Sequence, residues 1–185
     1  MICIEVIKSK HYDQLIDFCN ACNELGYVNN ASIEKMRLLW CKCNGEYWCA
    51  TQDNKIVAVA GVHTFPEMGP NAWRILFRGC ELPGESNFKG LSKGDWKSIT
   101  QRDFIPIFID YCDSDELYIT TNIEGSGHHM RNHRLMGLLA KQGILIKIKD
   151  CIINNTLQTV WQLNINEYIK RRGRIGNDYA YYEED

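Results

Sequence analysis

The chain has 185 residues, of which 45% are hydrophobic and 24% are charged, and its formal net charge is -2. A chain of this length buries roughly 70% of the surface that it exposes when unfolded, which fits one compact domain and excludes disordered, collagen-like and coiled-coil proteins. With 21 basic against 23 acidic side chains, it has no general attraction to nucleic acids or acidic membranes, so such a partner would need a local basic patch.

The apolar runs of the sequence are much shorter than the roughly 20 residues that cross a membrane as a helix. Residues 1–5 already include Glu5, where an export signal would be hydrophobic. We therefore expect a cytoplasmic protein without a membrane partner.

The chain contains nine cysteines, an odd number, and we expect reduced thiols rather than a disulfide framework. Cys19 and Cys22 are followed by Cys41 and Cys43, a C-x2-C and C-x-C pattern that could bind zinc. Cys19 and Cys22, however, continue an apolar repeat with helical spacing, so we interpret them as small core residues. We expect no metal site, and zinc stays the alternative.

The first half of the chain predicts one strand, two helices and a meander of three strands. Ser32 is a suitable N-cap for the second helix, and Asp53-Asn54-Lys55 is a hairpin signal between two β-rich runs. In chain order we expect a strand at 2–7, helices at 11–25 and 32–43, and strands at 47–51, 56–63 and 72–82.

The second half begins with the long polar, Gly-rich loop 83–94. Pro106 should kink or divide the helix that follows, and Gly143 is placed to end the last long helix. We expect helices at 95–112 and 130–142, strands at 117–123, 144–153 and 159–165, and a charged and aromatic tail at 169–185.

This order of elements predicts a mixed α/β (α+β) fold: a central, mostly antiparallel sheet with one parallel β-α-β crossover and helices on both faces. We expect a single domain over residues 1–168. A ligand should bind at the crossover, beyond the carboxyl end of the strand that ends at Leu82.

The loop and the helix start after this strand have the chemistry of an anion site. Small residues let the backbone approach a phosphate, N–H groups at the start of a helix point toward it, and lysines add positive charge. The alternative is a surface loop with solvated lysines. The residues concerned are Lys89, Gly90, Leu91, Ser92, Lys93, Gly94 and Asp95.

Element order and loop together resemble the GNAT superfamily of acyl-CoA-dependent N-acyltransferases. In that family a strand leads into the pattern Arg/Gln-x-x-Gly-x-Gly/Ala, whose backbone binds the pyrophosphate of CoA. Here Lys89 replaces the Arg or Gln, Ser92 replaces the first glycine and Gly94 matches the last position. The resemblance implies that the chain binds acetyl-CoA, or another acyl-CoA, through residues 89–95.

A second stretch extends the resemblance, since family members follow the next strand with an Asn-containing helix that ends in a Tyr-x-x-x-Gly-Phe-like run. Asn122 closes the predicted strand and Asn132 lies in the predicted helix, so the resemblance implies that both contact the cofactor. Leu139 stands where the family often has the tyrosine that protonates the CoA thiolate.

Acyl transfer to an amine needs a general base near the crossover. Glu81, at the end of the strand that enters the loop, is our candidate, and Glu67, after the preceding strand, is the second. Each could instead be a solvated carboxylate at a strand end. The resulting hypothesis is an N-acyltransferase that takes an acyl group from acyl-CoA to an amine acceptor not specified by the sequence.

Histidines gather around the start of the last long helix at His128, His129 and His133. They could bind acceptor, transfer a proton, share a metal if a third ligand exists, or form a polar helix start. The basic cluster at 170–174 would neutralise few phosphates, so we do not expect a nucleic acid partner, although modification of a nucleic acid or of a protein bound to one stays an alternative.

A non-enzymatic alternative comes from Ser92 and Leu139, which depart from the family pattern. The chain also resembles GNAT-like proteins of tailed bacteriophages, some of them associated with virion assembly. In that case it would be a binding or assembly protein with a decayed site, located in the host cytoplasm or the virion.

Overall fold

The structure is a computed structural model, and it describes residues 2–24, 44–80, 99–124 and 127–171. Within these ranges, nothing is described of the side chains of 21–24, 77–80, 99–101 and 127–132. None of the helices in these ranges is long and apolar enough to span a membrane.

The chain divides into two compact units, which are described separately. Unit 1 contains Met1–Thr64 and Leu76–Phe108, and unit 2 contains Phe65–Ile75 and Ile109–Asp185. A single domain over residues 1–168 stays a prediction.

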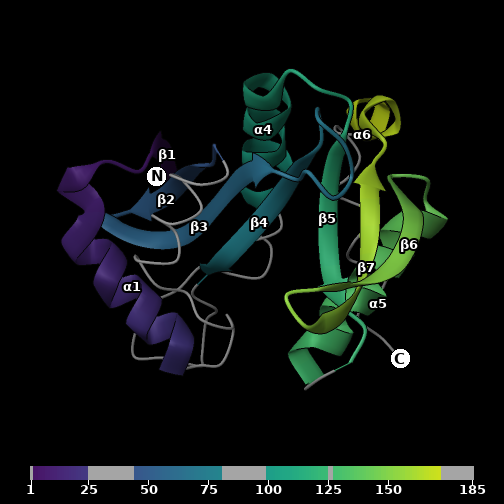
Figure 1. The fold of residues 1–185 in the computed structure, drawn as a ribbon. Helices are drawn as coiled ribbons and strands as arrows, with labels where there is room; N and C mark the ends of the chain where they lie inside the picture. The colour runs from purple at the N-terminus through teal and green to yellow at the C-terminus, as the bar shows by residue number, and fades with distance from the viewer. Residues whose placement is uncertain (1, 25–43, 81–98, 125–126, 172–185) are drawn as a thin grey trace. The chain divides into compact units, whose positions relative to one another are not determined.

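In the described ranges, seven strands form the sheet, hydrogen-bonded in the order β1-β2-β3-β4-β5-β7-β6 (Figure 1). The sheet is mostly antiparallel, and β4 and β5 are its parallel pair. This arrangement confirms the predicted mixed α/β fold with one parallel crossover. The strands are β1 (Ile2–Val6), β2 (Glu46–Gln52), β3 (Lys55–Thr64), β4 (Trp73–Cys80), β5 (Leu117–Asn122), β6 (Leu145–Ile153) and β7 (Thr156–Leu163).

The helices match most of the predicted ones in position. Pro106 is the second residue of an α-helix that directly follows a π-helical turn. Proline has no N–H to continue a regular helical ladder, so the change from π- to α-helix next to it agrees with the predicted division of this helix. The predicted helix 32–43 lies outside the described residues. The helices are η1 (Ser9–His11), α1 (Tyr12–Glu24), η2 (Ile99–Phe104), α4 (Ile105–Cys112), α5 (Gly127–Lys141) and α6 (Ile165–Arg171).

Unit 1 buries both faces of β2. Tyr47 and Cys49 belong to a core cluster with Leu15 of α1, whose apolar side chains recur at helical spacing. On the opposite face, Trp48 packs against Phe108 of α4, with 5.5 Å between the ring centroids. The predicted hairpin turn between β2 and β3 is confirmed by the positive φ angles of Asp53 and Asn54, +50° and +60°, which Asp and Asn tolerate in a two-residue turn.

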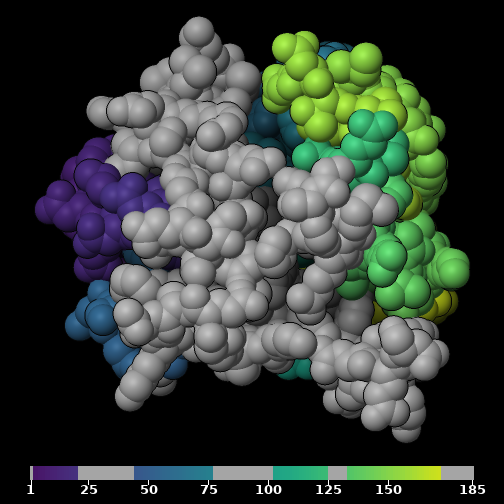
Figure 2. Space-filling model, turned by 90° about the horizontal axis from the view of Figure 1, so that it is seen from below, coloured from purple at the N-terminus to yellow at the C-terminus, as the bar shows by residue number. Residues whose placement is uncertain are grey.

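Unit 2 is built on β5, β7 and β6, and α5 packs against β5 and β6. The strands β6 and β7 form a hairpin whose turn residues, Asn154 and Asn155, both have positive φ angles. β6 is the last strand in the sheet order, and its residues 146–150 are exposed. Figure 2 shows atoms of this hairpin, in yellow-green, at the surface.

Gly143 ends α5 as predicted. Its φ of +78° is left-handed, a conformation that costs glycine little. The N–H of Gly143 donates to the carbonyl of Ala140, and the N–H of Ile144 donates to the carbonyl of Leu139, at 2.9 and 3.0 Å. This pair of hydrogen bonds is a Schellman cap, which satisfies carbonyls at the end of the helix.

Two predicted boundaries in unit 2 were wrong. β7 begins at Thr156 instead of 159, because the hairpin turn needs only two residues. It ends at Leu163 instead of 165, because Ile165 begins α6. Asn164 caps α6 by accepting a hydrogen bond from the N–H of Glu167 at 3.2 Å.

Candidate active site

The parallel pair β4–β5 is where the sequence predicts a ligand. β4 runs to Cys80 and β5 runs to Asn122. Among the residues that the structure describes, the parallel ladder joins Trp73 with Leu117, Arg74 with Tyr118 and Ile75 with Ile119.

The predicted cofactor loop follows β4 in the chain. β4 ends at Cys80, so Glu81, the predicted base, is the next residue, and the chain enters η2 at Ile99 after the loop. Glu81 and all seven candidate residues from Lys89 to Asp95 lie outside the described residues. Their roles therefore stay predictions. Glu67, the second candidate base, is exposed in the turn between β3 and β4.

The two candidate asparagines belong to β5 and α5. Asn122 is the half-buried last residue of β5 and lies opposite Gln158 in the ladder with β7. Asn132 is a residue of α5, but its side chain lies outside the described ones. The position of Asn122 at the carboxyl end of a parallel strand agrees with the prediction, and the cofactor contacts of both residues stay predictions.

Leu139 is buried in α5, with 8% of its surface exposed. Its hydrocarbon side chain has no proton to donate. The position where the resembled family often has a tyrosine is therefore a buried apolar residue in this chain.

A polar network that sequence analysis missed links β5, β7 and α5 in unit 2. The indole Nε1 of Trp161 donates to the hydroxyl oxygen of Thr121 at 2.8 Å. The same hydroxyl oxygen lies 3.1 Å from Nδ1 of His133, whose ring is 5.6 Å from the Trp161 ring. Of the three predicted histidines, His133 is the one with a described side chain, and it is a partner in this network.

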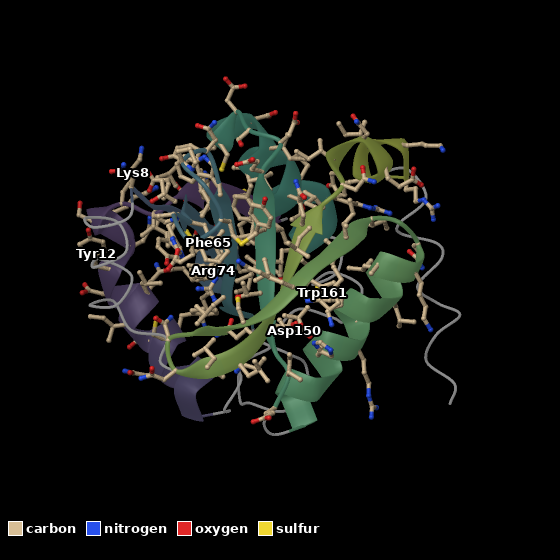
Figure 3. The ribbon with its side chains drawn as sticks, turned by 45° about the vertical axis from the view of Figure 1, so that its right-hand side comes forward. Lys8, Tyr12, Phe65, Arg74, Asp150 and Trp161 are labelled. Atoms are coloured by element: carbon tan, nitrogen blue, oxygen red, sulfur yellow. The ribbon has the colours of Figure 1, made fainter. Side chains whose placement is uncertain are left out.

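A separate set of hydrogen bonds joins β7 to β6 near the exposed edge. Thr159, opposite Thr121, donates a hydrogen bond of 2.6 Å to Asp150 of β6, which also accepts one from Lys147 at 2.9 Å. These two hydrogen bonds, that from Thr159 first, hold the pKa of Asp150 below its usual value. Asp150 is therefore a stable carboxylate at neutral pH and a poor general base. Figure 3 shows Trp161 and Asp150 on this hairpin.

A second polar cluster lies around Arg74 of β4. Its Nη2 donates to the hydroxyl of Thr120 on β5 and, at 3.1 Å, to Oε1 of Gln158 on β7. The guanidinium carbon is 5.5 Å from the centroid of the Phe65 ring, within the range of a cation–π contact (Figure 3). Arg74 could have been noticed in the sequence, because it is a charged residue within the otherwise apolar run of a predicted strand.

In the part of the chain that the structure describes, no three side chains of His, Cys, Asp or Glu lie close enough together to bind a metal ion. Among the cysteines of the zinc pattern, only Cys19 has a described side chain. It is buried in the core cluster with Leu15 and Phe18, as expected for a small core residue.

No protein-family model and no curated protein matches this sequence. Solved structures, in contrast, match its fold. An acetyltransferase of the GNAT family from Staphylococcus aureus Mu50 aligns with a TM-score of 0.56 at 12% identity, covering 88% of this chain and 99% of that one. The chain has the GNAT fold.

Two further GNAT-fold comparisons cover nearly the whole chain. The N-acyl amino acid synthase FeeM from uncultured soil microbes aligns with a TM-score of 0.59 at 8% identity, covering 92% of this chain and 94% of that one. A chimera of the spermidine N-acetyltransferase SpeG from Vibrio cholerae and hSSAT gives 0.57 at 9% identity, covering 92% and 99%. Identities this low show the fold alone.

Proposed function

We propose that this chain is an N-acyltransferase that transfers the acyl group of acetyl-CoA, or of a related acyl-CoA, to an amine. The observation that carries the proposal is the GNAT fold in combination with a near-match to the pyrophosphate pattern directly after β4. In the proposed reaction, the amine nitrogen attacks the thioester carbonyl. A C–N bond forms, the C–S bond breaks, and the CoA thiol leaves.

Residues 89–95 bind the pyrophosphate in this proposal, through backbone N–H groups and the lysine charges. Asn122 and Asn132 contact other parts of the cofactor. Glu81 accepts the proton that the amine loses.

A thiol-release assay tests this function. The protein is mixed with acetyl-CoA and a panel of primary amines, free CoA thiol is followed with a chromogenic disulfide, and products are weighed by mass spectrometry. We expect thiol release that depends on the amine, with a product heavier by one acetyl group. Thiol release at the buffer rate with every amine would contradict catalysis, and Glu81→Gln identifies the base by lowering the rate.

The buried Leu139 favours a second candidate, a GNAT-like binding or assembly protein without catalysis, such as a phage virion-associated protein. Such a protein would copurify with virions and release no thiol with any amine. The proposed enzyme, in contrast, belongs in the cytoplasm, where acyl-CoA and amines are both present.

A further inference from the structure

The outer edge of β6 is the side of this strand that faces away from β7. Among the described strands, β6 is the last in the sheet order, and its partner is β7 (Figure 1). A strand at the end of a sheet leaves the N–H and C=O groups of its outer edge without a strand partner. This edge can therefore accept a further strand.

Large apolar side chains of β6 are exposed on both faces of the sheet. Ile146 is 46% exposed and lies opposite Gln162, and Ile152 is 73% exposed and lies opposite Leu157. Gln162 and Leu157 are an odd number of positions apart on β7, so their side chains, and those of the paired isoleucines, point to opposite faces. A helix docked on one face would leave one isoleucine in water, whereas a strand added to the edge contacts both.

The charges of β6 select the kind of strand that fits. The strand carries Lys147 and Lys149, both exposed, against Asp150. Asp150 already accepts hydrogen bonds from Thr159 and Lys147, at 2.6 and 2.9 Å. The surplus charge of β6 is positive, and lysines on an edge strand hinder pairing with an identical strand. An acidic strand, in contrast, is attracted to this edge.

The segment 177–185 of this chain has the matching composition. It carries four acidic side chains, three tyrosines and no lysine or arginine. Tyrosine is favoured in strands, where its ring packs on apolar side chains of a neighbouring strand. The segment is as long as β6, which has nine residues.

The described part of the chain brings this segment close to the start of β6. Leu163, the last residue of β7, pairs with Leu145, the first residue of β6. α6 begins two residues after Leu163, and its seven residues extend about 10 Å. The linker 172–176 spans up to roughly 17 Å when extended. Asn177 can therefore reach Leu145, and the chain can continue from there parallel to β6.

We propose that the acidic, tyrosine-rich segment 177–185 pairs with the outer edge of β6 as a further strand, parallel to it. The segment then covers Ile146 and Ile152 and places carboxylates close to Lys147 and Lys149. This pairing is independent of the proposed acyl transfer.

Hydrogen exchange of the full chain, read by peptide mass spectrometry at low salt, tests the pairing. We expect the amides of 177–185 to exchange at least about 10-fold more slowly than those of a synthetic peptide with the same sequence. Glu183→Lys combined with Glu184→Lys should remove this protection and should also speed the exchange of β6. Salt at about 1 M should weaken the protection in the wild type, because it screens the attraction between the charges.

Asp17→Lys combined with Asp110→Lys is the matched control. It makes the same change of charge at exposed carboxylates of α1 and α4, and it should keep the protection of 177–185. Lys149→Glu alone should remove the protection, and its combination with Glu183→Lys and Glu184→Lys should restore part of it.

Two results would overturn the pairing. One is exchange of 177–185 in the wild type at the rate of the free peptide. The other is protection that grows with protein concentration, together with dimers in analytical ultracentrifugation, because the occupant of the edge would then be a second copy of the chain.

Discussion

The indole N–H of Trp161 on β7 and the hydroxyl oxygen of Thr121 on β5 are joined by a hydrogen bond of 2.8 Å. The two residues are 40 positions apart in the chain. Trp161 is 4% exposed and Thr121 is 7% exposed, so water has little access to either group. The bond therefore supplies the indole with an acceptor that solvent does not replace.

Thr121→Val removes this acceptor without changing the shape of the side chain. We expect a loss of about 1–3 kcal/mol in the free energy of unfolding, because the buried indole N–H loses its partner. Urea denaturation measures the loss. The double variant Thr121→Val, Trp161→Phe should lose less free energy of unfolding than the sum of the losses in the two single variants. If the two losses add strictly, the hydrogen bond contributes nothing to stability.

Gly61 on β3 has no room for a side chain. A Cβ there would lie 2.4 Å from Cδ1 of Tyr47 and 2.5 Å from the carbonyl oxygen of Glu46. Gly61→Ala should therefore lower the free energy of unfolding by about 1–3 kcal/mol. Gly137→Ala is the matched control, because a Cβ at this helical position meets nothing within 4 Å and should stabilise α5 by up to about 1 kcal/mol. Equal effects of the two changes would contradict this packing.

Glu5 links β1 to η1. Its carboxylate accepts a hydrogen bond of 2.7 Å from Lys10 and lies 3.3 Å from Nε2 of His11. The hydrogen bond from Lys10, and then that from His11, hold the pKa of Glu5 below the usual 4.5. A lowered folded-state pKa adds stability above the unfolded value, and this stability is lost as the pH falls through the folded value.

Glu5→Gln should therefore lower the melting temperature at pH 7, and its difference from the wild type should shrink as the pH falls below 4.5. Scanning calorimetry over this range measures both. Asp17→Asn, at an exposed carboxylate of α1, is the control. A Glu5→Gln difference that is constant with pH would show that the ionised carboxylate is not the stabilising form.

The thiols differ in their expected reactivity. Burial raises the pKa of Cys49 to about 11 and that of Cys112 to about 12, whereas Cys3 is exposed. At pH 8, about one in a thousand Cys49 thiols is ionised, and the thiolate is the reactive form. Brief treatment of the native protein with iodoacetamide should label Cys3 and spare Cys49 and Cys112 until urea is added. Peptide mass spectrometry reads the sites, and native labelling of Cys49 as fast as Cys3 would refute the assigned burial.

Local signals in the sequence predicted most of the fold. Asp53 and Asn54 fit the left-handed positions of a hairpin turn, and Gly143 fits a helix end, so these boundaries follow from residue chemistry. α6 was missed because Ile165 continues the alternation of β7, although Asn164 followed by Glu167 is a recognisable helix start. A local sequence pattern predicts the boundary of a helix or strand correctly only where it does not compete with a second pattern, as strand alternation and a helix start compete here.

The candidate site was less predictable. Arg74 meets Gln158 at a separation of 84 positions, and this contact depends on the registers of β4 with β5 and of β5 with β7. A shift of one residue in either ladder would turn these side chains to opposite faces. Sequence patterns indicate which residues form strands, but the register that unites these polar groups is a property of the folded sheet.

Calorimetric titration of acetyl-CoA into the protein tests the central claim most directly. We expect binding with one site per chain, weaker binding for Gly94→Val, whose branched side chain obstructs the phosphate, and tighter binding for Ser92→Gly. Lys89→Ala should give an intermediate loss, and all three variants should keep the melting temperature of the unliganded protein. Absence of binding at millimolar acetyl-CoA, or unchanged affinity in all three variants, would contradict the claim that this loop holds an acyl-CoA.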